Sequence, residues 1–253
     1  MFGCIIQARM ESERFPGKVM KKVDGKKPSL FFTVSQLKNS KYINKIVIAT
    51  STKKSDDAIQ KLSQEIGIEC FRGSFEDVLD RYYICSKNFQ FKNIIRITGD
   101  CPLIDPKIVD DFIKKFKTNN YDYIHNFDPR TFPDGMDIEI FTHIALKKAW
   151  KKAKLASERE HVTAYFRNNS DKFKIKNIKN RNNFSKYRIT LDYKEDLKLI
   201  KNIIKGIPER PIFMKDIIYF LEKNPDFLKI NQKYEANEGY KKSLELDKKL
   251  RNN

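Results

Sequence analysis

Several familiar motifs and segments are missing from this chain of 253 residues. It has only 9 glycines, and no segment reads G-x-x-x-x-G-K-[ST] or G-x-G-x-x-G, which excludes the P-loop and the dinucleotide-binding fingerprint. The 4 cysteines form no C-x-x-C pair, which argues against a structural zinc site and a disulfide framework. No apolar run is long enough to cross a bilayer, and the N-terminus has no signal-peptide pattern. We therefore expect a cytoplasmic protein without a membrane anchor.

The chain has an excess of positive charge. The net charge is +18, from 51 Lys and Arg against 33 Asp and Glu. Such an excess is typical of nucleic-acid binders, but here it is mostly Lys, spread over the whole chain and mixed with Asn and Ile. No cluster interleaves basic and aromatic residues in the way that base stacking requires. We therefore expect no nucleic-acid partner, although the positive field would attract nucleotides and sugar phosphates.

Apolar runs of strand length alternate with segments of helical spacing. This rhythm predicts an α/β fold with a doubly wound, mostly parallel sheet. The tail, 207–253, reads as mostly helical, so we expect a domain at 1–206 followed by a helical extension. The predicted strands are 2–8, 45–50, 68–71, 93–98, 121–126, 136–141, 173–178 and 187–191.

The loop after the first strand carries the cations Arg9, Arg14 and Lys18. In open α/β sheets, ligands bind outside the carboxyl ends of the strands. Arg forks and Lys point charges both suit phosphate oxygens, and Pro16-Gly17 allows the backbone to turn tightly. The residues alone indicate an anion site. A solvated basic loop on a basic protein is the alternative.

Two aspartates follow predicted strands. Asp100 comes after the strand at 93–98, beside a glycine and shortly before a proline. Magnesium prefers one or two carboxylates together with substrate phosphates and water, so Asp100 is a candidate metal ligand. A turn-forming aspartate is the alternative. Asp192 ends the strand at 187–191, and the alternative is that it is the N-cap of the next helix.

Other polar residues have a local structural interpretation. Ser74 with Asp77, and Ser157 with Glu160, have the spacing of a capping box at a helix start. In the alternating run 136–141, Asp137 and Glu139 share one face, which lies either in solvent or in a cleft. The three histidines show no metal-ligand spacing.

Several of these segments, in this order, resemble motifs of the cytidylyltransferases that activate sugars and sugar acids. The resemblance is strongest to the spore coat polysaccharide biosynthesis protein F group, with the sialic acid and Kdo cytidylyltransferases more distant. It covers nearly the whole chain. The matching strings are I-Q-A-R-M and R-F-P-G-K within 6–18, R-G-S-F-E-D-V-L-D-R-Y at 72–82, R-I-T-G-D-C-P-L-I-D-P at 96–106, P-R-T-F-P-D-G-M-D-I-E at 129–139, S-E-R-E-H-V-T at 157–163 and R-I-T-L-D-Y-K-E-D-L at 188–197.

The resemblance implies a Rossmann-like nucleotidyltransferase fold of the glycosyltransferase-A type, and transfer of CMP from CTP to a sugar-type acceptor with Mg²⁺ and release of pyrophosphate. It also implies a homodimer. A nucleotide site is implied for Gln7, Ala8, Arg9, Arg14, Lys18, Ser74 and Asp77. Catalytic roles are implied for Arg9, Lys18 and Asp100, and metal binding for Asp100 and Asp192. Acceptor contacts are implied for Arg130, Asp134, Asp137, Glu158, Arg159 and His161.

The chain departs from the family pattern after Asp192, where Tyr193-Lys194 replaces the usual Thr-Pro. This departure weakens the transfer of a metal role to Asp192. Two other classes of protein stay open. One is a metal-dependent glycosyltransferase of similar fold, whose usual D-x-D pair is absent here, and the other is a basic nucleic-acid-binding protein.

Overall fold

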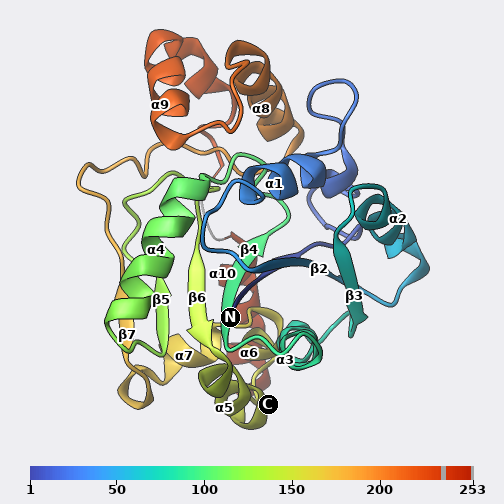
Figure 1. The fold of residues 1–253 in the computed structure, drawn as a ribbon, viewed down its shortest axis with the longest axis vertical. Coiled ribbons are helices and arrows are strands. Elements are labelled where there is room, and N and C mark those ends of the chain that lie inside the picture. The colour runs from blue at the N-terminus through green and yellow to red at the C-terminus, as the bar shows by residue number, and fades with distance from the viewer. Residues whose placement is uncertain (235–237, 252–253) are drawn as a thin grey trace.

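A computed structural model describes residues 1–234 and 238–251. Its centre is a 7-stranded sheet in the order β3-β2-β1-β4-β6-β5-β7 (Figure 1). In this sheet β6 runs antiparallel to β4 and β5, and the other pairings are parallel, which confirms the prediction of an α/β fold with a doubly wound, mostly parallel sheet. The strands are β1 (Phe2–Gln7), β2 (Lys45–Ser51), β3 (Glu69–Gly73), β4 (Asn93–Thr98), β5 (Tyr123–His125), β6 (Glu139–Thr142) and β7 (Ile175–Asn177).

Helices cover both faces of the sheet, because successive strand residues point to opposite sides and both sides are apolar. In β1, Cys4 and Ile6 pack against one layer of helices, and Ile5 packs against the other. The first layer contains α1 (Ser29–Leu37), α2 (Asp57–Glu65) and α4 (Pro106–Thr118), and its apolar core continues into α8 (Lys194–Gly206) and α9 (Met214–Lys223). The second contains α3 (Val78–Asn88), α5 (His143–Lys152) and α7 (Ala164–Asn168), with α6 (Ala156–Glu160) beside α3.

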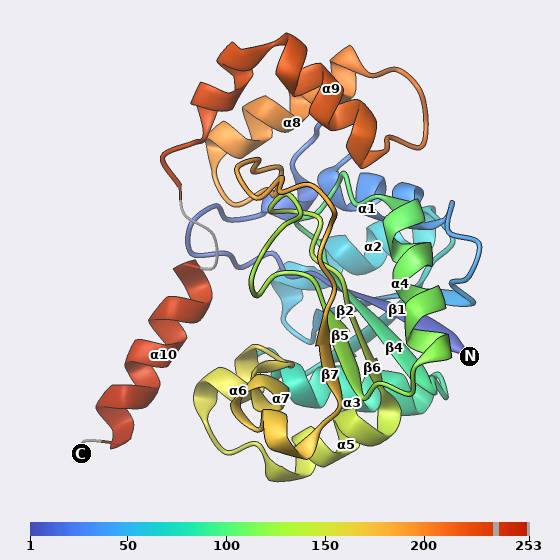
Figure 2. The ribbon, with the colours of Figure 1, turned by 90° about the vertical axis from the view of Figure 1, so that its left-hand side faces the viewer.

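The C-terminal helices separate into two places. Figure 2 shows α8 and α9 together at one end of the molecule, whereas α10 (Glu238–Arg251) lies apart on the flank. Asn231, after α9, donates from Nδ2 to Arg188 O at 3.1 Å and to Asp196 Oδ1 at 2.7 Å, which ties the tail to the sheet domain. A domain boundary after residue 206 stays a prediction, and part of the helix predicted from Tyr234 lies outside the described residues.

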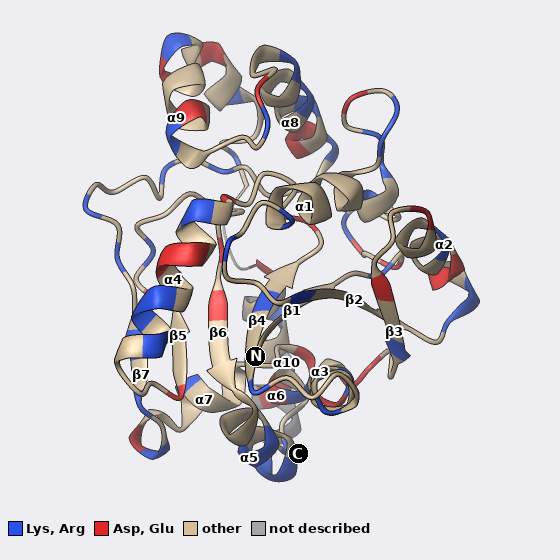
Figure 3. Cartoon of the chain, in the orientation of Figure 1, with Lys and Arg blue, Asp and Glu red and all other residues tan. Residues whose placement is uncertain are grey.

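Charge is spread as the sequence predicts. In Figure 3, Lys and Arg occur on helices at both ends of the molecule, with Asp and Glu among them. None of the helices in the described part of the chain is long and apolar enough to cross a membrane.

The strand predicted at 187–191 is wrong. This segment bonds to two separate loops instead of one neighbouring strand: Ile189 N donates to Asp134 O at 2.7 Å and Leu191 N donates to Asp100 O at 2.9 Å. Gly135, with φ of +103°, makes the approach possible, because a Cβ there would lie 2.6 Å from Thr190 N. The segment therefore draws the loops of Asp100 and Asp134 together.

Two helix starts also differ from the predictions, and at a third the structure excludes an alternative that the sequence left open. Ser157 lies inside α6 and is fully buried, while Glu158 Oε2 accepts from the backbone N of Leu155 at 3.5 Å. Asp77, not Ser74, is the N-cap of α3, and its Oδ1 accepts from Asp80 N at 2.8 Å. Asp192 is not the N-cap of α8. Tyr193 takes that position, which leaves the Asp192 carboxylate available for other contacts.

Candidate active site

The buried side chain of Asp56 holds the loop after β1 in place. Asp56 is 1% exposed, and its Oδ1 accepts from Met10 N at 2.7 Å while its Oδ2 accepts from Ser51 Oγ at 2.5 Å. Burial alone would raise the pKa of Asp56, but the hydrogen bonds from Ser51 and Met10 outweigh it and lower the pKa. Gly17, with φ of +68°, closes the loop by donating to Met10 O at 2.8 Å. Asp56 was not predicted from the sequence as a support of this loop.

Lys18 bridges the two predicted metal ligands. Its Nζ lies 2.5 Å from Asp100 Oδ2 and 2.6 Å from Asp192 Oδ1. Arg14 Nη2 lies 2.7 Å from the same Asp192 oxygen, and Arg188 Nη2 lies 3.4 Å from the other. Two of the three cations predicted after β1, Arg14 and Lys18, therefore form one cluster with the acids predicted after two later segments.

The cluster is electrostatically coupled. Burial opposes the charge of Lys18, but Asp100 and Asp192 outweigh burial and raise the pKa of its ammonium. Burial would raise the pKa of Asp192, yet Lys18 and Arg14 hold it well below the usual range. Asp192 is thus a carboxylate at any physiological pH, as a metal or cation ligand must be.

The donor set suits magnesium. Within the described residues no group of three or more His, Cys, Asp and Glu side chains is arranged to hold a metal. Asp100 and Asp192 are a pair, and both reach the single position that Lys18 Nζ takes up. Mg²⁺ typically uses one or two carboxylates and completes its coordination with phosphate oxygens and water, so the pair fits that ion.

A cavity of about 610 Å³ opens above the β1 loop. Of the residues predicted for the nucleotide and for catalysis, it is lined by Gln7, Ala8, Arg9, Arg14, Lys18 and Asp100. Arg9 packs over the Phe75 ring at 5.5 Å and lies 3.8 Å from Glu160. With Arg96 and Lys242, five cations line this cavity among four acids, and such a set of cations is suited to a polyphosphate. We call this cavity the cationic cavity.

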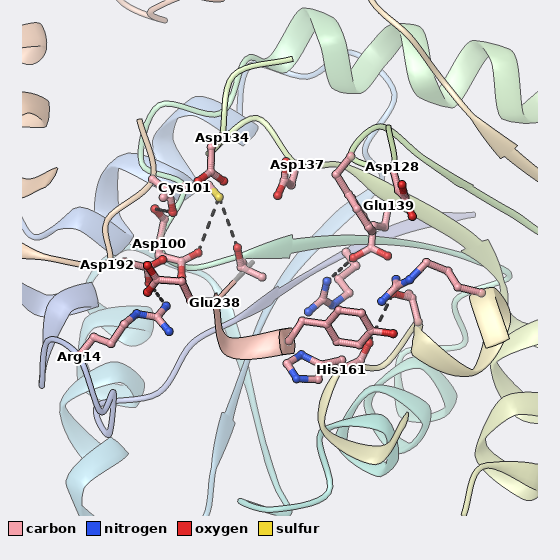
Figure 4. A pocket seen from close by; sticks show the side chains of 17 residues that line it. Arg14, Asp100, Cys101, Asp128, Asp134, Asp137, Glu139, His161, Asp192 and Glu238 are labelled. Atoms are coloured by element: carbon pink, nitrogen blue, oxygen red, sulfur yellow. Dashed lines mark hydrogen bonds and ion pairs between the residues drawn. The ribbon is translucent and has the colours of Figure 1, made fainter. Parts of the chain in front are cut away.

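A second cavity, of about 450 Å³, adjoins the first. It is lined by the predicted acceptor residues Asp134, Asp137 and His161, and also by Asp192 (Figure 4). The predicted acceptor residue Arg130 lies behind them, with Nη2 3.0 Å from Asp137 Oδ2 and 3.6 Å from Asp134 Oδ1. Burial and the charge of Asp137 raise the pKa of Asp134. Arg130 therefore holds two acidic side chains of this cavity in place.

Arg96 and Arg167 are among the residues that line the second cavity without having been predicted from the sequence. Arg96 on β4 pairs with Glu139 on β6, and Tyr123 Oη on β5 donates to Glu139 Oε2 at 2.5 Å. Arg167 on α7 lies over the Phe127 ring at 5.3 Å. One signal was available, since Arg96 interrupts the apolar run of a central strand and must have a partner there.

Besides Arg130, four predicted site residues do not line these two cavities. Ser74 Oγ accepts from Asp77 N at 3.0 Å, and Asp77 pairs with Arg159, which also donates to Trp150 O at 2.7 Å. Glu158 lines a separate hollow and accepts from Asn168 Nδ2 at 3.0 Å. Their roles toward the nucleotide or the acceptor stay predictions, and the contacts described here are structural.

Comparison with known proteins decides the family. A family model described as cytidylyltransferase matches residues 3–233. The chain belongs to the cytidylyltransferase family. The resemblance inferred from the motifs is therefore confirmed, and this cytidylyltransferase is a nucleotidyltransferase enzyme that uses CTP to transfer CMP.

Individual relatives agree with this assignment. An uncharacterized protein of Methanocaldococcus jannaschii is 38% identical over 90% of this chain and 93% of its own length. The spore coat polysaccharide biosynthesis protein SpsF of Bacillus subtilis is 34% identical over 88% of this chain and 94% of its own. A solved cytidylyltransferase structure from Leptospira borgpetersenii superposes with a TM-score of 0.86 at 37% identity, covering 90% of this chain and 96% of that one. The cytidylyltransferase fold therefore extends over most of the chain.

Proposed function

We propose that this cytidylyltransferase transfers CMP from CTP to a hydroxyl or phosphate oxygen of a sugar, sugar acid or sugar phosphate destined for a surface polysaccharide. The acceptor oxygen attacks the α-phosphorus, the bond from that phosphorus to the oxygen of the β-phosphate breaks, and pyrophosphate leaves, while a hydroxyl acceptor releases its proton to water. We further propose that the enzyme is a cytoplasmic homodimer.

One observation supports this proposal most strongly. The cationic cavity lies above the β1 loop, and the second cavity beside it, which we call the acidic cavity, is lined by Asp134, Asp137 and Asp192. The two cavities share the lining residues Arg14, Arg96, Thr98, Asp100 and His161. A triphosphate in the first cavity would therefore present its α-phosphate next to a group bound in the second. Holding two reactants side by side in this way is a large part of what phosphoryl-type transfer requires.

The chain's own residues supply charge and position. Arg9, Arg14 and Lys18 neutralise the triphosphate and stabilise the charge that develops on the leaving pyrophosphate. Asp134 and Asp137, which Arg130 orients, accept hydrogen bonds from acceptor hydroxyl groups. We assign the holding of Mg²⁺ to Asp100 and Asp192. When bound, the ion adds further charge neutralisation at the phosphates.

Product analysis tests the proposal. The protein is incubated with CTP and Mg²⁺ and a panel of neutral sugars, sugar acids and sugar phosphates, and pyrophosphate and the CMP ester are measured. Pyrophosphate release that depends on one acceptor class supports the proposal. Release of CMP or CDP from a nucleotide sugar, with no pyrophosphate from CTP, contradicts it and indicates glycosyl transfer. UTP, ATP and GTP in place of CTP serve as nucleotide controls.

A further inference from the structure

The C-terminal helix α10 contributes side chains to both cavities of the site. Glu238 and Tyr240, in its first turn, line the acidic cavity. Lys242 and Ser243, one turn further, line the cationic cavity. In Figure 4 the first turn of α10 enters the view beside the cavity, with Glu238 directed toward the carboxylates of Asp100 and Asp192.

Tyr240 is held at the cavity by charge and by aromatic contacts. The Arg167 guanidinium lies 4.9 Å from the Tyr240 ring centre and 5.3 Å from that of Phe127, so one cation contacts two rings. The His161 ring meets Tyr240 edge-on at 5.1 Å. Arg167 Nη1 donates to Thr163 Oγ1 at 2.9 Å, which fixes the guanidinium itself. These contacts hold the rings of Tyr240 and Phe127 at the acidic cavity, together with the polar side chains of His161 and Arg167.

A separate set of contacts positions Glu238. The Tyr193 hydroxyl donates to Glu238 Oε2, and the Tyr193 ring stacks on Tyr234 with ring centres 3.7 Å apart and planes 4° from parallel. This contact adds a carboxylate from α10 to a cavity that is also lined by Asp134 and Asp137, from the segment before β6.

The far part of α10 is seated on α6. His161 Nε2 and Ser243 Oγ lie 2.8 Å apart, and Ser243 Oγ lies 2.8 Å from Glu160 Oε2. Asp247 is 6% exposed, and its Oδ1 accepts from Ser157 N at 3.3 Å. The motif residues Ser157, Glu160 and His161 thus serve as the platform that places α10 over the site.

We propose that Tyr240 and Glu238 of α10 contact the acceptor and determine its specificity, and that the acceptor portion they bind is a hydroxyl-rich sugar ring. An aromatic face packs against the C–H face of such a ring, while carboxylates accept hydrogen bonds from its hydroxyl groups. The inference rests on the proposed function, because it assigns a substrate to one cavity of that site. The nucleotide is bound from the other cavity, so loss of the Tyr240 ring weakens acceptor binding and leaves CTP binding intact.

Steady-state kinetics test this assignment with the acceptor that gives most pyrophosphate in the panel. Tyr240→Ala raises KM for that acceptor about tenfold, as the loss of one good aromatic contact predicts, and changes KM for CTP by less than about twofold. Tyr240→Phe keeps the ring and retains an acceptor KM near that of the unmodified protein. Glu238→Gln keeps the shape of the side chain and also raises KM for the acceptor.

Tyr219→Ala is the matched control, since Tyr219 is 65% exposed on α9 and lines neither cavity. Equal acceptor KM values for the Tyr240→Ala and Tyr219→Ala variants would overturn the assignment. So would a Tyr240→Ala variant in which KM for CTP and for acceptor rise together, because α10 would then shape the whole cleft. Absence of pyrophosphate from the unmodified protein with every acceptor would defeat the proposed function itself, and the inference with it.

Discussion

Replacing Lys18 by methionine removes the cation that joins Asp100 to Asp192. The side chains of these three residues are 12%, 20% and 16% exposed, so the charges are largely shielded from water. Methionine fills a similar volume without charge, and it leaves two carboxylates facing each other. We expect the variant to fold and to be less stable than the unmodified protein.

The size of the effect follows from the partners that remain. Removing one member of a buried ion pair typically costs about 3–5 kcal/mol, because the other charge stays buried without compensation. Asp192 keeps Arg14 at 2.7 Å and Arg188 at 3.4 Å, which favours the lower end of that range. A loss of about 3 kcal/mol corresponds to a fall in Tm of about 6–12 °C for a domain of this size.

Mg²⁺ supplies the second arm of the experiment. In the unmodified protein Lys18 Nζ takes the position between the two carboxylates, so a divalent cation must compete with it. In the variant that position is free. With a Kd near ~1 mM, ~10 mM Mg²⁺ would return about 1.4 kcal/mol of stability. The same Mg²⁺ adds less to the unmodified protein.

Urea unfolding and thermal unfolding, each with and without Mg²⁺, measure both arms. Lys114→Met is the matched control, since Lys114 Nζ lies 3.2 Å from Asp111 with side chains 55% and 65% exposed. An exposed pair of this kind contributes about 1 kcal/mol at most. Equal stabilities of the two variants, with no extra gain from Mg²⁺ for the Lys18 variant, would refute the assignment of these carboxylates as a metal site.

Three further predictions concern single residues. Asp100→Asn abolishes metal-dependent pyrophosphate release while circular dichroism stays unchanged, and unchanged turnover would remove Asp100 from the metal site. Asp56→Ala releases Met10 N and raises KM for CTP about tenfold in initial-rate assays, whereas an unchanged KM would show that the loop needs no support. Burial and nearby arginines lower the pKa of His161 to about 4, so the stability it contributes is present above pH ~6.5 and is lost on acidification toward pH ~4. Between pH 7 and 5 the protein should lose about 2 kcal/mol more in urea unfolding than a His161→Gln variant, and equal losses would contradict the lowered pKa.

The sheet and the position of the site were predictable from the sequence, for a physical reason. Parallel strands place their carboxyl ends on one edge, so the cations after β1 and Asp100 after β4 had to meet there. The apolar runs at 2–8 and 93–98 were long and clear enough to fix those strands. The family motifs then indicated which of the charged residues belong to one site.

Other contacts depend on tertiary packing that short patterns do not record. The run 187–191 has the composition of a strand, but its backbone bonds to the loops of Asp100 and Asp134. Ser157 has cap spacing, yet it lies inside α6 under α10. The carboxylate of Glu139 is held by Arg96 and Tyr123 across three neighbouring strands, and such a pairing requires the strand order to be known.

The location of bound CTP tests the central claim most directly. A crystal structure of the protein with CTP and Mg²⁺ should show the triphosphate beside Arg9, Arg14 and Lys18, with the metal held by Asp100 and Asp192. CTP bound outside the cavity above the β1 loop, or a metal distant from both carboxylates, would contradict the account.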